Sequence, residues 1–367
     1  MNGATLPIVI HTEARGTLSS SHVLRIALSL VLVLGVAVGC ADDTDDTDEQ
    51  EDTNQQDDQE GPAEPPFAVG RQDLVLVDPA RPTDPVESIP LEGRDDRTVE
   101  LSVFYPAQGQ PGERAEVLSE WDHSGQLPVE SVAEVAAAPA DGPFPLLVFA
   151  HGFSGQGSSF VALAERWARE GYVVALPTFP LSRTGVAFAD DYVNQPGDLS
   201  FVIDRLTGPD ETGEVPAELS EGLVDVDRIA LGGHSLGAAT VFRAVYNACC
   251  VDDRVRATVT VAGGPMDVGE GGYDDQPDVP MLLVHGAADP AVDVAVGDAM
   301  VDFVQAPVTY LRFDSGDHVS VFVGDEGRLF GDAVLAFLDD ELRDDPARLE
   351  ELPDVVDSGG LAELRTG

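Results

Sequence analysis

The chain has 367 residues, of which 43% are hydrophobic and 24% are charged, so it is long enough to bury a large core. Its charge is far from balanced, because 67 acidic residues face 20 basic ones, every basic residue is Arg, and the formal net charge is −47. Contacts to phosphate groups need a basic patch, so this charge excludes nucleic-acid binding and disfavours a polyanionic substrate. We interpret the acidic excess as a solvated surface.

The N-terminal segment predicts export. Arg15 and Arg25 precede thirteen uncharged residues, 26–38, which are too few to span a membrane but suit the core of a signal peptide. Residues 37–40 read Ala-Val-Gly-Cys and resemble the cleavage site of a bacterial lipoprotein. We therefore expect a signal peptide over residues 1–39 and a lipid anchor at Cys40, which would hold the protein at the extracytoplasmic face of the cell membrane. A simple signal peptide and an uncleaved anchor are the alternatives.

An acidic segment follows the predicted anchor. Residues 42–60 carry eleven acids and no base, and such a stretch cannot bury enough apolar surface to offset the entropy of the chain. We therefore predict a disordered acidic linker over residues 40–69. Calcium binding is the lesser alternative, because the run lacks the glycine and the closing Glu of an EF-hand loop.

From about residue 70 the pattern is that of a folded domain. Residues 98–106 alternate and predict a half-buried antiparallel strand near a sheet edge, whereas the apolar run 145–150 predicts a strand that is covered on both faces. Beyond them, helix and strand patterns alternate. We expect helices at 158–171, 198–206, after residue 235, at 293–304 and around 331–342, and strands at 172–177, 228–233, 255–264, 279–286 and 307–313. This order predicts one α/β domain over residues 70–345, with a mostly parallel sheet and helices on both faces, and a C-terminal tail over 346–367.

The stretch GGHSLG at 232–237 lies between a predicted strand and a predicted helix. Its last five residues match the pattern G-x-S-x-G, in which glycines let the strand and the helix approach each other while the serine stays exposed at the corner. The pattern alone is weak, but its place between a strand and a helix makes it specific. It predicts that Ser235 is a nucleophile.

A serine nucleophile needs a histidine base, and the histidine needs an acid that fixes its tautomer. The chain order of the α/β-hydrolases is Ser, then acid, then His. His318 follows the strand predicted at 307–313 and is the histidine that we expect to act as base. Asp289 ends the loop after the preceding strand and is the expected acid, with Asp267 as its competitor.

The remaining candidates surround this predicted triad. The backbone N–H groups of Leu236 and Phe153 are the expected oxyanion donors. Phe153, Phe179 and Phe188 are either walls of an acyl site or core residues. The adjacent Cys249 and Cys250 form either two packed free thiols or a vicinal disulfide, with a structural role in both cases.

These motifs resemble the α/β-hydrolase superfamily over residues 70–345. Within it, the chain resembles a branch that contains dienelactone hydrolases, platelet-activating-factor acetylhydrolases, chlorophyllases and cutinase-like polyester-degrading enzymes. The stretch RDDRTVELSVFYPA resembles the opening strand of this branch, PLLVFAHGFSG resembles its oxyanion loop, and GHSLGAAT resembles its strand-to-helix corner. The resemblance implies an esterase with no metal or organic cofactor. The segment between the strands at 172–177 and 228–233 is too short for a large lid.

We therefore predict an exported serine carboxylic-ester hydrolase that acts through an acyl-enzyme. Its substrate would be a small-molecule, lipid or polyester ester, and the protein would be a monomer that touches the membrane through its lipid anchor only. A catalytically inactive binding module of the same fold, or an acyltransferase or peptidase that uses the same triad, are the alternatives.

Overall fold

The structure is a computed structural model that describes residues 65–366 except 88–90, 113–130 and 267–268. The predicted signal peptide, Cys40 and nearly all of the acidic linker lie outside the described residues. Within the described part, no helix is long and apolar enough to cross a membrane.

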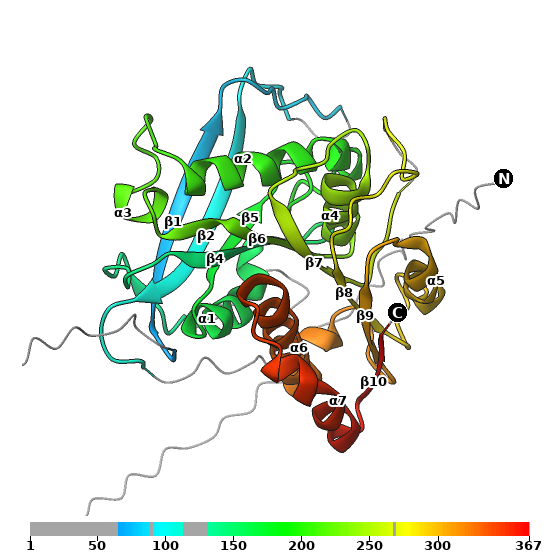
Figure 1. Cartoon of the computed structure of the whole chain (residues 1–367). Coiled ribbons are helices and arrows are strands. Elements are labelled where there is room, and N and C mark those ends of the chain that lie inside the picture. Colours follow the sequence, from blue (N-terminus) through cyan, green and yellow to red (C-terminus); the bar gives the residue numbers. More distant parts are fainter. Residues whose placement is uncertain (1–64, 88–90, 113–130, 267–268, 367) are drawn as a thin grey trace, which may run out of the picture. The chain divides into compact units, whose positions relative to one another are not determined.

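A single ten-stranded sheet organises the described chain, in the order β10-β9-β8-β7-β6-β4-β5-β2-β1-β3 (Figure 1). The strands are β1 (Ala68–Asp78), β2 (Arg97–Ala107), β3 (Glu134–Val135), β4 (Phe144–Ala150), β5 (Val173–Thr178), β6 (Val224–His234), β7 (Val255–Val261), β8 (Met281–Gly286), β9 (Val308–Phe313) and β10 (Ala362–Thr366). The six strands β4 to β9 are neighbours in the sheet and are all parallel to one another. Strand β2 pairs antiparallel with β5 and with β1. The predicted α/β fold with a mostly parallel sheet is confirmed.

Helices cover both faces of the sheet. The α-helices are α1 (Val161–Arg169), α2 (Gln195–Thr207), α3 (Ala217–Ser220), α4 (Leu236–Tyr246), α5 (Val294–Phe303), α6 (Gly324–Arg343) and α7 (Ala347–Gly359), and the short 3₁₀ turns are η1 (Gly157–Phe160), η2 (Ala189–Val193) and η3 (Ser320–Phe322). One hydrophobic cluster packs α2, α3, α4 and α5 on one face, and a second packs α1, α6 and α7 on the other (Figure 1). Between β5 and β6 the chain forms η2, α2 and α3 but no large lid.

The burial of the strands follows their place in the sheet. Every residue of β4 is buried, as the continuous apolar run predicts for a strand covered on both faces. Strand β1 lies near the sheet edge, where Leu74 and Leu76 are buried while Val75 between them is 57% exposed. We predicted no strand before residue 98, because the charged residues of β1 interrupt its short alternation of buried and exposed positions.

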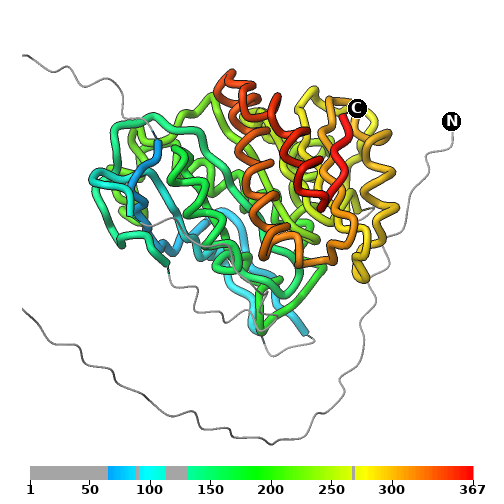
Figure 2. Tube along the Cα trace, turned by 90° about the horizontal axis from the view of Figure 1, so that it is seen from below, coloured from blue at the N-terminus to red at the C-terminus, as the bar shows by residue number. Residues whose placement is uncertain are grey.

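The predicted C-terminal tail over residues 346–367 is wrong. Helix α7 packs beside α6, and β10 extends the sheet by pairing antiparallel with β9 from Ala362 opposite Phe313 to Thr366 opposite Thr309 (Figure 2). The segment is rich in acids, so its two buried apolar residues, Leu352 and Val356, form a sparse signal at helical spacing. The folded domain therefore extends to residue 366.

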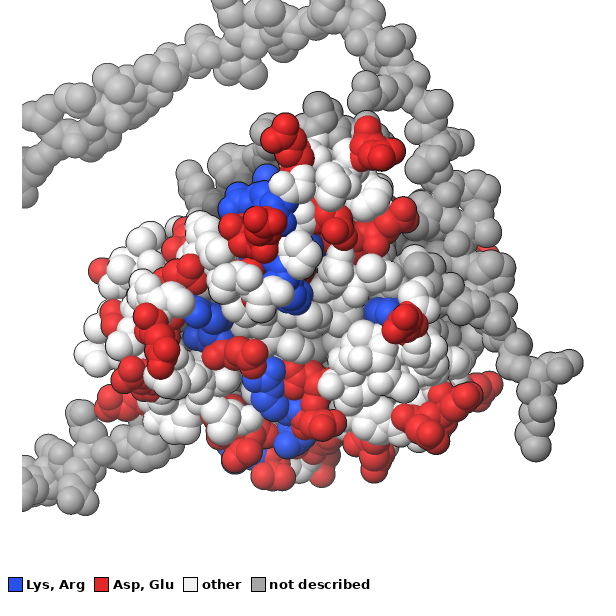
Figure 3. Space-filling view, turned by 90° about the horizontal axis from the view of Figure 1, so that it is seen from above, with Lys and Arg blue, Asp and Glu red and all other residues white. Residues whose placement is uncertain are grey.

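On one face of the described surface, charge is distributed rather than gathered (Figure 3). On the face seen in Figure 3, acidic side chains are spread widely and the arginines lie beside them. Two such surface pairs are Arg71 with Asp73, at 3.0 Å, and Arg328 with Asp325, at 2.8 Å. Exposed ion pairs of this kind contribute little to stability.

Arg97, the first residue of β2, differs from these because it is fully buried. Its guanidinium donates to both oxygens of Asp198 in α2, at 2.6 Å each, and to Asp191 in η2, with the shorter contact at 2.7 Å. Arg81 adds a further contact to Asp198, at 2.9 Å. These ion pairs fasten the segment after β5 to the antiparallel side of the sheet.

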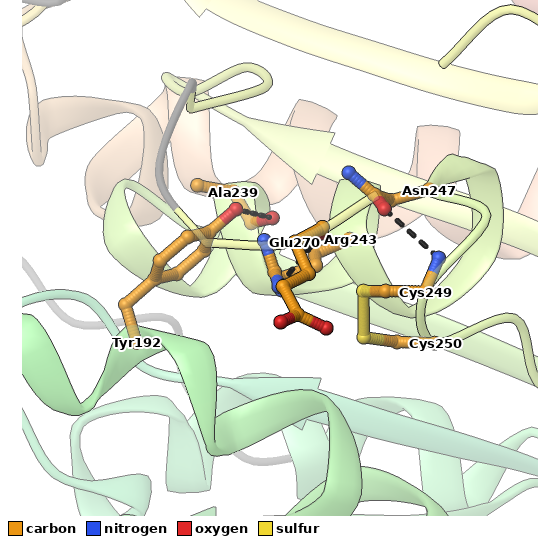
Figure 4. The surroundings of a disulfide bond; sticks show 7 residues. All are labelled: Tyr192, Ala239, Arg243, Asn247, Cys249, Cys250 and Glu270. Atoms are coloured by element: carbon orange, nitrogen blue, oxygen red, sulfur yellow. Dashed lines mark hydrogen bonds between the residues drawn. A yellow bond between two sulfur atoms is a disulfide. The ribbon is translucent and has the colours of Figure 1, made fainter. Parts of the chain in front are cut away.

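Cys249 and Cys250 form a disulfide in the turn after α4 (Figure 4). Asn247 Oδ1 accepts the N–H of Cys249 at 3.0 Å. Arg243 Nη2 donates to the carbonyl of Glu270 at 3.0 Å, so the end of α4 is tied to the loop between β7 and β8. Of the two states that the sequence left open, the structure has the vicinal disulfide.

Candidate active site

Ser235 occupies a sharp corner between β6 and α4. Its backbone has φ 55° and ψ −116°, in the positive-φ region that residues with a side chain rarely adopt. Its N–H donates to the carbonyl of Val261 at 2.9 Å, which holds the corner against β7. A serine in this conformation presents its hydroxyl at the carboxyl edge of the sheet, where ligands bind in open α/β folds.

The two glycines that flank this corner are required by the close approach of chain segments. A Cβ on Gly233 would lie 2.4 Å from the backbone of Gly237, and a Cβ on Gly237 would lie 2.3 Å from the carbonyl oxygen of Ala150. Real Cβ atoms do not come so close to backbone atoms. The spacing of the glycines in the motif therefore follows from how tightly α4 packs on β4 and β6.

Asp289 and His318 meet at the same edge. Asp289 Oδ2 lies 2.7 Å from His318 Nδ1, and its Oδ1 accepts the backbone N–H groups of Ala291, at 2.8 Å, and Val292, at 2.9 Å. The Asp289 side chain is fully buried, whereas that of His318 is 19% exposed. A carboxylate only accepts hydrogen bonds, so Nδ1 of His318 carries the hydrogen and Nε2 is left with a lone pair that can take a proton.

The surroundings of Asp289 keep its carboxyl group ionised. Burial alone would raise the pKa of Asp289, but hydrogen bonding from His285 and His318 and from the backbone of Val292 outweighs it and holds the pKa below its usual value. Nε2 of His285 lies 3.5 Å from Asp289 Oδ2 and 2.9 Å from the carbonyl of Val292. Asp289 can therefore stabilise an imidazolium at His318.

The low pKa of Asp289 predicts how stability depends on pH. In the unfolded chain an Asp titrates at about 3.9, so the ionised carboxylate stabilises the fold above that pH, and this contribution is lost as the pH falls through the lower folded-state pKa. We expect the difference in unfolding free energy between the parent and Asp289→Asn to stay constant above about pH 5 and to shrink below about pH 4. Urea denaturation at stepped pH measures it, and a difference that persists unchanged to about pH 2 would contradict this expectation.

Backbone and side-chain bonds join the loops that carry Asp289 and His318. Ala288 N donates to Gly316 O at 2.9 Å, which links the loop after β8 to the loop after β9. Asp317 Oδ1 accepts the N–H of Ser320 at 2.7 Å, so Asp317 shapes the turn that presents His318. This role of Asp317 was not predicted from the sequence.

His234, the residue before Ser235, makes a contact that was not predicted from the sequence. Its Nε2 lies 2.8 Å from the carbonyl oxygen of His318, and the centroids of the two imidazole rings are 4.6 Å apart. The middle positions of G-x-S-x-G accept many residue types, so the sequence carried no signal for a partner 84 positions away.

The predicted oxyanion donors lie where the loop after β4 meets the start of α4. Within the described residues, no hydrogen bond occupies the N–H of Phe153 or that of Leu236, the first residue of α4. His151 shapes the loop, because its Nδ1 lies 2.7 Å from Gly152 O and its Nε2 accepts the N–H of Phe179 at 3.0 Å. Burial lowers the pKa of His151 to about 4, so this histidine stays neutral and structural.

Gly152 gives a test of how closely this loop must approach Ser235. A Cβ at position 152 would lie 3.0 Å from Ser235 Cβ and 3.2 Å from His234 Nδ1, so a larger residue must displace one of them. We expect Gly152→Ala to lower kcat about tenfold or more for an ester substrate, because small misplacements of reacting groups are costly. Steady-state kinetics measure this, with Gly359→Ala as control, since a Cβ there meets nothing within 4 Å. Parental kcat in Gly152→Ala would contradict it.

The aromatic residues divide between surface and core. Phe179 is fully buried in the core and packs on the ring of His151 at 5.0 Å, so it is not an acyl-site wall. Phe153 is 38% exposed and Phe188 is half-buried. A small apolar cluster beside Ser235 was not predicted and consists of Tyr192, Leu236, Ala239 and Met266.

Three sequence predictions for the site remain without a structural answer. No hydrogen bond joins the Ser235 hydroxyl to a described residue, and such bonds often tighten only when substrate binds. Asp267, the competing acid, and Cys40, the expected lipidation site, lie outside the described residues.

Among the residues that the structure describes, no group of His, Cys, Asp or Glu side chains could hold a metal ion.

Comparison with known proteins bears on the fold. No protein-family model and no curated protein matches the chain. Among solved structures, the ferulic acid esterase from Streptomyces cinnamoneus matches with a TM-score of 0.57 and 23% sequence identity, over 78% of this chain and 93% of that one. Likeness at this level of identity shows a shared fold. With its single mixed sheet, helices on both faces and no large lid among the described residues, the chain has an α/β-hydrolase-type fold.

Proposed function

We propose that this protein is a serine carboxylic-ester hydrolase in which Ser235 is the nucleophile, His318 the base and Asp289 the acid. The observation that carries the proposal is the 2.7 Å hydrogen bond between Asp289 and His318. The backbone carbonyl of His318 is in turn hydrogen-bonded to His234, the residue before Ser235. An ionised acid, a histidine with its Nε2 free to accept and a serine at a positive-φ corner are the components of nucleophilic acyl transfer. The structural likeness to a ferulic acid esterase supports an ester as the substrate.

The mechanism follows from these positions. In acylation, His318 Nε2 takes the proton of the Ser235 hydroxyl while the oxygen attacks the ester carbonyl. The resulting oxyanion accepts hydrogen bonds from the N–H groups of Phe153 and Leu236, and His318 then gives the proton to the departing alcohol. In deacylation, water attacks the acyl-enzyme while His318 accepts its proton. As the intermediate collapses to the acid, His318 returns that proton to Ser235 Oγ, which restores the free enzyme. Asp289 stays ionised throughout.

Covalent labelling tests this function directly. We expect a fluorophosphonate to add one phosphonyl group to the parent protein at Ser235, located by peptide mass spectrometry, and to leave Ser235→Ala unlabelled. The labelled protein should lose its activity on a chromogenic short-chain ester. A protein with neither label nor turnover would be the inactive binding module instead. Product analysis with alcohol acceptors identifies an acyltransferase, and release of amines from amide substrates identifies a peptidase.

The proposal extends to location and substrate range. We propose export and lipidation at Cys40, supported by the apolar run 26–38 and the residues that follow it. Cys40→Ser should abolish lipid labelling and membrane association, and a variant that keeps both would contradict the anchor. A panel of acyl-chain lengths and polyester film then defines the substrate class, for which we propose small-molecule, lipid or polyester esters that a monomer hydrolyses.

A further inference from the structure

His234 lies at the junction of three segments of the candidate site. It is the last residue of β6, and its backbone continues directly into Ser235. Its side chain is enclosed, because the residue is only 6% exposed and its ring packs against Phe322, at 4.9 Å between centroids, and Phe160, at 6.4 Å. A polar ring in such a place needs a hydrogen-bond partner.

That partner belongs to the proposed base. His234 Nε2 lies 2.8 Å from the carbonyl oxygen of His318. A carbonyl oxygen only accepts, so His234 donates through Nε2–H, and the neutral ring has its lone pair on Nδ1. The contact joins the corner that holds Ser235 to the loop that holds His318, and no other described hydrogen bond joins His234 or Ser235 to that loop.

The third segment is the loop after β4. A Cβ on Gly152 would lie 3.2 Å from Nδ1 of His234, so there is little room between this loop and the imidazole ring. The His234 side chain therefore lies beside the loop that carries the expected oxyanion donor Phe153, next to the corner of the nucleophile, and is hydrogen-bonded to the loop of the base. Its position is suited to holding all three in register.

The charge state of His234 also fits this place. Burial, followed by the neighbouring His318, lowers the pKa of His234 well below its usual value, so the ring is neutral near pH 7. The titratable groups that act on it are His318, Asp289 and His285, and the other rings packed on it are those of Phe160 and Phe322. A neutral ring does not oppose the positive charge that His318 acquires in each proton transfer, although the two rings are only 4.6 Å apart.

We propose that His234 is a positioning residue, which sets the distance between the His318 imidazole and the Ser235 hydroxyl by donating a hydrogen bond to the His318 carbonyl. The inference rests on the proposed function of Ser235 and His318. It assigns a role to a residue outside the proposed triad.

Two variants of similar size separate the hydrogen bond from packing. Gln at position 234 keeps an amide donor near the place of Nε2, whereas Phe fills the aromatic space without a donor. We expect His234→Phe to lower kcat about 10- to 100-fold with KM within about twofold, and His234→Gln to keep kcat within about threefold of the parent. A role in packing alone would give the reverse order. Parental kcat in His234→Phe, or equal losses in both variants, would overturn the proposal.

A second measurement isolates the acylation step. The rate at which a fluorophosphonate labels Ser235 depends on the base, so it should fall in His234→Phe by about the same factor as kcat, and an unchanged rate would overturn the proposal. Thermal unfolding shows whether His234→Phe is folded; if it is not, His234→Asn, whose amide is too short to reach the carbonyl, takes its place with the same expected loss. Full activity in Ser235→Ala would refute the proposed function itself, whereas an inactive Ser235→Ala beside a fully active His234→Phe would refute only the positioning role.

Discussion

Ser235→Ala is expected to lower kcat for a chromogenic short-chain ester by about 10⁴- to 10⁶-fold, while KM changes little. The substitution removes the oxygen that forms the acyl-enzyme and leaves the corner between β6 and α4 in place. Steady-state kinetics and circular dichroism on the purified protein measure the two effects. Ser358→Ala is the matched control, because its exposed hydroxyl in α7 bonds only the carbonyl of Val355 among the described residues.

The same prediction extends to the base. His318→Gln should cost about as much as Ser235→Ala, and the double variant should lose no more than either single one, because the two groups act in one proton transfer. Losses that multiply in the double variant would show that the residues act independently. Hydrolysis by Ser235→Ala at the parental rate would refute the mechanism outright.

Arg97→Met is expected to lower the free energy of unfolding by about 3–5 kcal/mol, because it leaves the buried Asp191 without its cation and the buried Asp198 with Arg81 alone. Both carboxylates have no exposed side-chain surface, so water cannot replace the guanidinium. Guanidinium chloride denaturation measures the loss. Arg71→Met is the control, since its exposed partner Asp73 is solvated and the expected change is about 0–1 kcal/mol.

The pH dependence of the Arg97 variant has a definite sign. Burial raises the pKa of Asp198, and Arg97 is the largest influence that lowers it. Without Arg97 the pKa rises further, so protonation relieves the buried charge and the loss of stability should shrink as the pH falls. Asp191→Asn and Asp198→Asn, added to Arg97→Met, should restore part of the stability at neutral pH. A loss below about 1 kcal/mol in Arg97→Met would contradict a buried and unsolvated network.

Elements were predictable where the chemical signal is local and dense. The centre of the sheet was placed correctly from the apolar run of β4 and from the alternating strand and helix patterns between β5 and β9. These signals are clear because buried parallel strands are apolar throughout. Strands β1 and β10 and helix α7 were missed. They lie at the outer parts of the fold, where few of their side chains are buried and charged residues interrupt the hydrophobic pattern.

The site shows the same division. The position of Ser235 at a strand-to-helix corner was predicted from its glycines, because the need for room at a tight corner is a property of adjacent residues. The order of elements singled out Asp289 and His318, and the structure brings these two together. The catalytic roles of all three remain predictions. Phe179 was left open between an acyl-site wall and the core, since the sequence pattern of an aromatic residue after a strand is the same in both cases, and the structure places it in the core.

The sequence by itself determined the α/β fold of this protein and the corner at Ser235, because hydrophobic period and glycine spacing act over a few residues. Only the tertiary structure decided which distant groups meet. The His234 ring donates a hydrogen bond to the His318 carbonyl, 84 positions away. The Arg97 guanidinium binds Asp191 and Asp198, which are 94 and 101 positions away. The physical reason is that a side chain's partner is selected by the packing of whole loops and strands, and each such contact forms only after distant segments have already been brought together.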